Sequence, residues 1–275
     1  VHDKCEIKGS IVGDLQCTLN QTNIGDNNNK FYIIQGVREA GTGQLFLFTH
    51  WGRVGYGGQS ATEAAADEPD LEKSFAKKFK SKTANKWEDR ANFVAKTKKY
   101  TLVEIESSDS LAARAASSPA KPAPSKKQKK KSTAKCRLDQ KTQGLVEWIL
   151  DEDMFKEQVT ALQFDLNKCP LGALTKTQVE KGYAILDQID KILKRRSPSS
   201  SAQELDTLSG SFYSLIPHAF GMSRPQSINS DELLKGKYDL LAVLNDIEIA
   251  QGMQKAGDDD DADIHAVDKL YQQLN

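Results

Sequence analysis

The sequence lacks the features of a membrane-spanning, secreted or metal-binding chain. No run approaches the ~20 consecutive apolar residues that cross a bilayer. The first ten residues, VHDKCEIKGS, contain no apolar stretch of the kind found in a secretory signal. The four cysteines form no Cys-x-x-Cys pair, and no histidine stands at ligand spacing from them. We therefore expect no membrane partner, no metal and a reducing compartment.

The sequence also lacks a recognisable catalytic constellation. His218 and His265 are isolated, and no Ser/His/Asp set or phosphate-binding loop can be found. We therefore predict no catalytic residue in this chain. It begins at Val1 and not at a methionine, and we interpret it as part of a longer protein.

Charge is balanced overall but segregated along the chain. The 38 basic and 38 acidic residues give a formal net charge of zero. Residues 73–87 nevertheless contain lysines and no acid, residues 117–137 are again basic without an acid, and residues 258–263 read DDDDAD. Basic segments of this kind indicate surfaces that face an anionic partner.

Residues 107–136 divide the chain. The stretch SSPAKPAPSKKQKKKSTAK has almost nothing to bury, so it cannot offset the entropy lost on ordering its backbone. We predict a basic disordered linker between a first domain at 1–106 and a second at 137–255, with an acidic loop in 256–275. The run KKQKKK is either plain linker or a site for nuclear import or loose phosphate binding.

The first domain is predicted to be α+β, with an antiparallel sheet and one helix. A helix over 68–87 is indicated by Leu71, Phe75 and Phe79, which recur every four residues after a proline and several acids. Strands are indicated by alternating or β-branched runs at 14–23, 27–37, 43–54 and 100–106.

The second domain is predicted to be an all-α helical bundle. Three pairs have the spacing of a helix-start signal, and each precedes apolar residues at helical spacing: Thr175 with Gln178, Ser201 with Glu204, and Asn229 with Glu232. The predicted fold therefore has two domains of different class.

The stretch THWGRVGYGGQS, residues 49–60, is the best candidate for a binding surface. Trp51 and Arg53 lie on one face of a strand because side chains alternate, and glycines permit close approach of another molecule. An exposed indole can stack on a sugar or base. The alternative is a buried Trp51 with Arg53 at the rim of an ordinary hairpin. The lysines of residues 73–86 are likewise either a solvated helix face or phosphate contacts.

The motif WGRVGYGG resembles the one that names the WGR domain. The resemblance continues through LNQTN, NNNKFYIIQ, FAKKFKSKT, NKWEDR and KKYTLVEIE, and covers roughly residues 5–106. The second half resembles the helical regulatory domain of poly(ADP-ribose) polymerases through LVEWILDEDMF, DLNKCPLGALTKTQVEKGYAIL, FYSLIPHAFGM and LLAVLNDIEIAQGM. The first half is most similar to the short members of that family that DNA breaks activate.

The resemblance implies that the first domain binds DNA strand breaks. Trp51 would pack against the terminal nucleotide, and Asn29 and Tyr100 would contact the DNA backbone nearby. Arg53 would join the DNA side to the helical domain and transmit the presence of a break.

The resemblance also implies that the helical domain is autoinhibitory. Its core, which includes Leu186, Leu208, Leu215 and Leu244, would loosen to release a transferase domain that uses NAD. That domain would follow this chain, so the chain alone would bind no cofactor and would be inactive. DNA repair in the nucleus is the implied setting. Two other functions stay open, a stand-alone nucleic-acid adaptor and a structural scaffold.

Overall fold

The computed structural model describes residues 1–104, 136–149, 152–162, 164, 174–194, 198–257 and 271. The predicted linker at 107–136 and the acidic segment at 256–275 fall almost wholly outside these ranges. Within them, no helix is long and apolar enough to cross a membrane.

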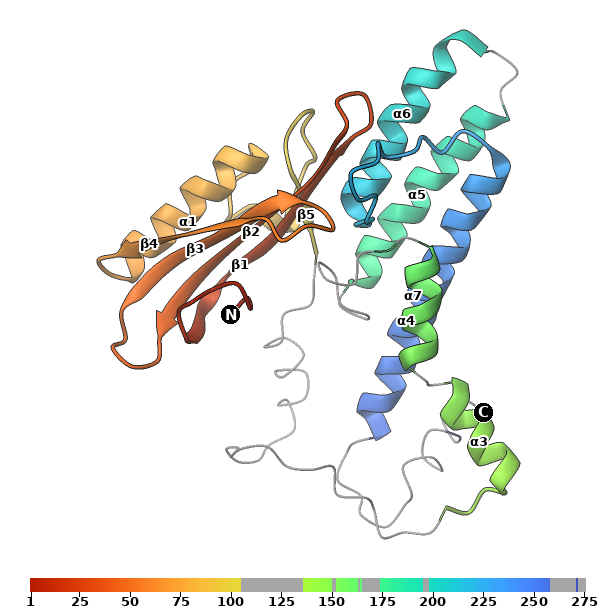
Figure 1. The fold of residues 1–275 in the computed structure, drawn as a ribbon, viewed down its shortest axis with the longest axis horizontal. Helices are drawn as coiled ribbons and strands as arrows, with labels where there is room; N and C mark the ends of the chain where they lie inside the picture. The colour runs from red at the N-terminus through yellow and green to blue at the C-terminus, as the bar shows by residue number, and fades with distance from the viewer. Residues whose placement is uncertain are drawn as a thin grey trace.

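The described chain forms an antiparallel sheet with one helix, followed by a helical region, which confirms the predicted fold class (Figure 1). The sheet has five strands in the order β4-β3-β2-β1-β5. The strands and the first helix are β1 (Gly9–Asn23), β2 (Asn28–Glu39), β3 (Leu45–Arg53), β4 (Gln59–Ala65), α1 (Glu68–Thr83) and β5 (Thr101–Val103). The helical region contains α3 (Gln140–Ile149), α4 (Glu152–Ala161), α5 (Lys176–Leu193), α6 (Pro198–Leu215) and α7 (Asp231–Gly257).

Helix α1 begins as predicted and ends earlier than predicted. The Asp67 side chain accepts a hydrogen bond from the backbone of Asp70, and Ala84 ends the helix in the left-handed conformation. The predicted helix had continued to residue 87. Instead Trp87 folds back and packs edge-on against Phe75 and Phe79.

Strand β4 was not predicted from the sequence. Its residues, QSATEAA, are mostly exposed and carry no alternating apolar pattern. It is nevertheless paired along its length with β3, from Leu45 opposite Ala65 to Trp51 opposite Gln59. An edge strand of this kind forms because its backbone pairs with the neighbouring strand. That pairing leaves no pattern in the strand's own sequence.

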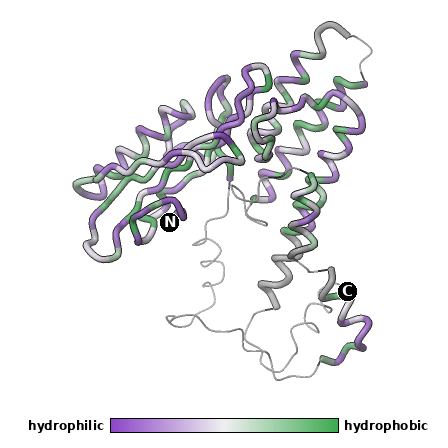
Figure 2. Tube along the Cα trace, viewed as in Figure 1, coloured by the Kyte–Doolittle hydropathy of each residue, from purple (hydrophilic) through white to green (hydrophobic). Residues whose placement is uncertain are grey.

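The two faces of the sheet belong to different cores. The adjacent β5 residues Leu102 and Val103 point to opposite faces, and Leu102 packs with the cluster that contains Leu71, Phe75 and Phe79 of α1. Val103 packs with the helical core instead. Helix α6 lies against β1 and β5 on this second face (Figure 1). Green and purple alternate along most strands and helices, as expected of elements with one buried side (Figure 2).

One of the three predicted helix starts is correct. Thr175 caps α5, because its side chain accepts a hydrogen bond from the backbone of Gln178. Helix α6 begins at Pro198, so Ser201 lies inside it and the start predicted after a Ser201 cap is four residues late. Helix α7 begins at Asp231, and Ser230 rather than Asn229 accepts the hydrogen bond from the backbone of Leu233.

Candidate nucleic-acid interface

The glycines of the turn between β3 and β4 are required by its backbone geometry. Gly58 has φ +68°, and a Cβ there would lie 2.5 Å from the carbonyl oxygen of Trp51. A Cβ on Gly52 would lie 2.7 Å from the Cα of Gly58. A residue type with a Cβ does not fit at either position, because the backbones of the strand and the turn approach each other too closely. The glycines therefore position Trp51 and Arg53 at the end of β3.

Three aromatic rings form a surface next to this turn, which we call the aromatic platform: Trp51, Tyr32 and Tyr100. Trp51 stacks on Tyr32 with ring centroids 5.7 Å apart and ring planes 17° apart. Tyr100 meets Tyr32 edge-on at 5.9 Å. Trp51 and Tyr100 are only partly buried. Trp51 is therefore not sealed inside the sheet, and its ring is supported by Tyr32.

Positive charge is concentrated beside the aromatic platform. The Lys82 ammonium lies 4.3 Å from the centroid of the Tyr32 ring. Burial, together with the neighbouring charges of Lys78 and Lys99, lowers the pKa of Lys82. Mutual repulsion of this kind is relieved when an anion binds among the lysines.

Arg53 joins the sheet to the helical region. Its Nε donates to the carbonyl oxygen of Gly221 at 2.6 Å, and its Nη2 donates to that of Ser223 at 2.8 Å. Its Nη1 donates to the carbonyl oxygen of Asn27 at 2.9 Å, and Nη2 also donates to the Asn27 side chain at 3.1 Å. One planar guanidinium thus connects the end of β3, the turn between β1 and β2, and the loop that follows α6.

Asn29 lies in the joint between the two domains. Its side chain is fully buried, and Nδ2 donates to the carbonyl oxygen of His218 at 2.9 Å. Its Oδ1 accepts a hydrogen bond from Thr22 at 3.0 Å. The expected contact of Asn29 with the DNA backbone stays a prediction, and the structure gives this side chain a second place, in the joint. It helps to hold the two domains together, because a buried amide needs hydrogen-bond partners and one of its two partners, His218, lies across the joint.

Further polar contacts close the joint between β1 and the end of α6. Asn20 donates to the carbonyl oxygen of Tyr213 at 2.8 Å, and the backbone N–H of Thr22 donates to Ser214 at 2.8 Å. Arg224 donates from Nε to the carbonyl oxygen of Ile24 at 2.7 Å. Most of these partners are backbone groups, so the joint depends on the course of the chain as much as on side chains.

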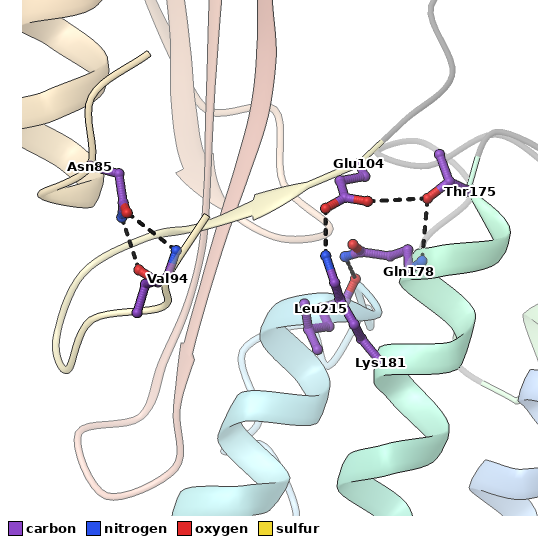
Figure 3. Close-up of polar contacts among 7 residues, drawn as sticks. All are labelled: Asn85, Val94, Glu104, Thr175, Gln178, Lys181 and Leu215. Carbon is purple, nitrogen blue, oxygen red and sulfur yellow. Dashed lines mark hydrogen bonds and ion pairs between the residues drawn. The ribbon is translucent and has the colours of Figure 1, made fainter. Parts of the chain in front are cut away.

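Glu104 makes a second link, at the end of β5 (Figure 3). Its carboxylate pairs with Lys181 at 2.6 Å and accepts a hydrogen bond from the Thr175 hydroxyl at 3.4 Å. Gln178 does not reach back to complete a capping box, and its Nε2 donates to the carbonyl oxygen of Leu215 at 2.9 Å. Because the Lys181 side chain is 45% exposed, this ion pair contributes little to stability.

A neutral histidine lies at the centre of the joint. His218 is fully buried, and its Nδ1 donates to the carbonyl oxygen of Ile216 at 2.6 Å. Burial, and then the charge of Lys237, hold the pKa of His218 well below its usual value. Burial also lowers the pKa of Lys237 to about 8. Its ammonium lies 5.6 Å from the centroid of the Tyr213 ring.

The four leucines predicted to form the helical core contribute to it unequally. Leu186 is fully buried and Leu244 is buried, whereas Leu208 and Leu215 are partly buried and pack against the same cluster.

Within the described ranges, no group of three or more His, Cys, Asp or Glu could hold a metal ion.

The sequence analysis missed Tyr32 and Glu104, and it did not single out Lys82. Tyr32 is directly opposite Trp51 in the pairing of β2 with β3. It could have been found only by aligning the two strands. Lys82 was included in the basic helix, but nothing in the sequence distinguishes it from its neighbours. Glu104 comes directly after β5, and the sequence around it does not indicate that the helical region packs beside this strand.

The comparisons with known proteins agree with this arrangement. The WGR domain family matches residues 15–94, and the regulatory domain of poly(ADP-ribose) polymerase matches residues 136–271. Protein mono-ADP-ribosyltransferase PARP3 is 42% identical to the chain in Mus musculus and 41% in Homo sapiens, and each alignment covers 95% of the chain. Poly [ADP-ribose] polymerase 2 of Homo sapiens is 32% identical over 100% of the chain.

The chain spans about half the length of these curated relatives, between 45% and 49%. Both matched domains occur in the order in which the fold shows them. The chain belongs to the poly(ADP-ribose) polymerase family, of which it carries the WGR domain and the regulatory domain.

Proposed function

We propose that this chain senses DNA strand breaks and restrains the transferase domain of a poly(ADP-ribose) polymerase until a break is bound. The observation that carries the proposal is the position of Arg53. It is two residues from the partly exposed Trp51, and it donates hydrogen bonds to the helical region at Gly221 and Ser223.

The aromatic platform suits the end of a nucleic-acid duplex. A break exposes a terminal sugar and base, and the Trp51 ring, backed by Tyr32, offers a flat surface for them. Tyr100 at the edge of the platform and the nearby Lys82 would contact the adjacent backbone. An intact duplex has no exposed terminal base to stack on Trp51. It would bind only through contacts between its phosphates and the lysines beside the platform, and that part of the affinity falls as salt is added.

Coupling to the helical domain follows from the shared guanidinium. A DNA end that competes for Arg53, or shifts it, changes the hydrogen bonds that the loop after α6 receives. A shift of this loop would move α6 and α7, and it would loosen the packing of the buried leucines Leu186 and Leu244. Such a switch requires two states separated by only a few kcal/mol. In this proposal NAD is consumed by the transferase domain of the whole protein, in the nucleus, during DNA repair.

The test is binding to a nicked duplex and to an intact duplex of equal length. The unaltered chain should prefer the nick, and Trp51→Ala should lose about tenfold to a hundredfold of that preference, the value of one base stacked on an aromatic ring. Tyr56→Ala is the matched control, since Tyr56 is an exposed aromatic residue of the same turn outside the platform. Equal binding of nicked and intact duplexes by the unaltered chain would end the proposal.

A further inference from the structure

A cleft of about 460 Å³ lies between the two domains. Its walls come from the end of β1 and the turn that follows it (residues 21–25), the basic loop of residues 95–99, and one side of α6, with single residues of β5 and α5. We call it the interdomain cleft. It is distinct from the aromatic platform, none of whose rings lines it.

The walls of the interdomain cleft suit a sugar–phosphate strand. Lys96, Lys98 and Lys99 contribute positive charge, and Asp206 is the single acid among the described residues that line the cleft. Beside apolar residues such as Ile185, amide and hydroxyl groups contribute much of the remaining lining, including those of Gln203 and Ser211, which are both exposed. Side chains of these types are the ones that contact phosphate and sugar oxygens.

The cleft takes the backbone of a nucleic acid better than its bases. In the part of the chain that the structure describes, no aromatic side chain lines it, so no surface is offered on which a base could stack. Gly210, which also lines the cleft, lets α6 pack closely on β1, because a Cβ there would lie 3.0 Å from the carbonyl oxygen of Thr22. A volume of 460 Å³ is within the usual range for binding sites.

The basic loop connects the cleft to the aromatic platform. Lys99 donates from Nζ to the carbonyl oxygen of Ser81 at 3.1 Å, and the backbone N–H of Tyr100 donates to that of Lys82 at 3.1 Å. Both bonds fasten the loop to the end of α1. The loop thus borders the platform through Tyr100 and the cleft through Lys96 and Lys98.

We propose that the interdomain cleft binds the backbone of the DNA strand that continues from the aromatic platform, so that α6 contacts DNA directly. The inference rests on the proposed function and adds a second place where DNA touches the helical domain. Because both domains build the cleft, occupancy by a strand and docking of the domains stabilise each other.

The test places charge on the α6 wall of the cleft. Gln203→Glu should weaken binding of the whole chain to a nicked duplex about fivefold to tenfold. It should also make binding less sensitive to salt: the slope of log K against log salt concentration should become shallower by about 0.9 for each phosphate that the protein no longer neutralises. Gln203→Lys should strengthen binding, a result that a merely structural disturbance would not give. The matched controls are Gln188→Glu and Gln188→Lys, at an exposed position of α5 outside the cleft, which should bind as the unaltered chain does.

The basic loop provides a second comparison. Lys98→Glu should weaken binding, whereas Lys73→Glu, at an exposed position near the start of α1, should change it less than about twofold. If both Gln203 variants bind like the unaltered chain while Lys98→Glu is weakened, the strand runs outside the cleft and the inference is overturned. Loss of nick preference in Trp51→Ala with no effect at Gln203 would leave the proposed function intact, so the two can fail separately.

Discussion

Replacement of Arg53 with alanine should separate DNA binding from its effect on the helical domain. The guanidinium makes four hydrogen bonds, of which two reach the loop after α6 and two reach Asn27. Arg53→Ala leaves Trp51 and Tyr32 in place, so the surface for a DNA end remains. We therefore expect nicked duplex to bind with reduced but measurable affinity.

The cost to domain docking can be worked from the two interdomain bonds. A hydrogen bond from a charged donor contributes about 1.5 kcal/mol or more, and less where water competes. The bond to Gly221 is partly buried, whereas the bond to Ser223 is exposed. Together they contribute about 2 kcal/mol, a change of about 30-fold in the docking equilibrium. The contacts of Asn20, Thr22 and Asn29 remain, so the domains should still associate.

Hydrogen exchange of the helical domain, with and without nicked duplex at saturation, measures the coupling. In the unaltered chain, binding of the break should speed exchange in the amides of α5, α6 and α7. In Arg53→Ala the same saturation should produce little change. Arg38→Ala is the control, because Arg38 is an exposed arginine of β2 whose ion-pair partner is Glu68 of the same domain.

The coupling role would be refuted by a clear result. If exchange in the helical domain still quickens on break binding to Arg53→Ala, the signal does not pass through this guanidinium. The remaining route would be the buried contacts of Asn29 or the cleft beside α6.

Two further predictions concern stability. Lys237 has a pKa of about 8 in the folded chain against a usual 10.5, so the folded state binds fewer protons between these values and stability should rise with pH across that window. Lys237→Met should stabilise the chain by up to about 3 kcal/mol at pH 7 and by nothing above about pH 10.5, as measured by urea unfolding; a gain that does not change with pH would contradict this reasoning. Gly58→Ala should lower stability by about 2 kcal/mol or more, because φ is +68° and the new Cβ would lie 2.5 Å from the carbonyl oxygen of Trp51. Thermal unfolding measures this, and Gly57→Ala, where a Cβ meets nothing within 4 Å, is the control.

Much of the fold could be predicted because its signals are local. Leu71, Phe75 and Phe79 recur at helical spacing, and the structure buries all three against the sheet. Thr175 caps α5 because a hydroxyl reaches a backbone N–H three residues away. The start of α6 could not be predicted in the same way, since Ser201 has suitable neighbours but lies inside the helix.

The candidate site was predictable in part. The sequence pointed to Trp51, Arg53 and Tyr100, and the structure places them around the end of one sheet. It did not indicate Tyr32, because the stack with Trp51 depends on the pairing of two strands. Nor did it indicate that Asn29 is buried, because its partner His218 is 189 residues further along the chain.

Except for strand β4, the sequence by itself determined which segments are strands and helices and which of their sides are apolar, since these follow from residue spacing and short-range hydrogen bonds. The tertiary structure alone decided which polar groups are available to a partner. Asn29 and Arg53 both carry polar side chains near one end of the sheet, yet one is sealed in the joint and the other spans it at the surface. That difference arises because burial depends on what the rest of the chain places beside each group.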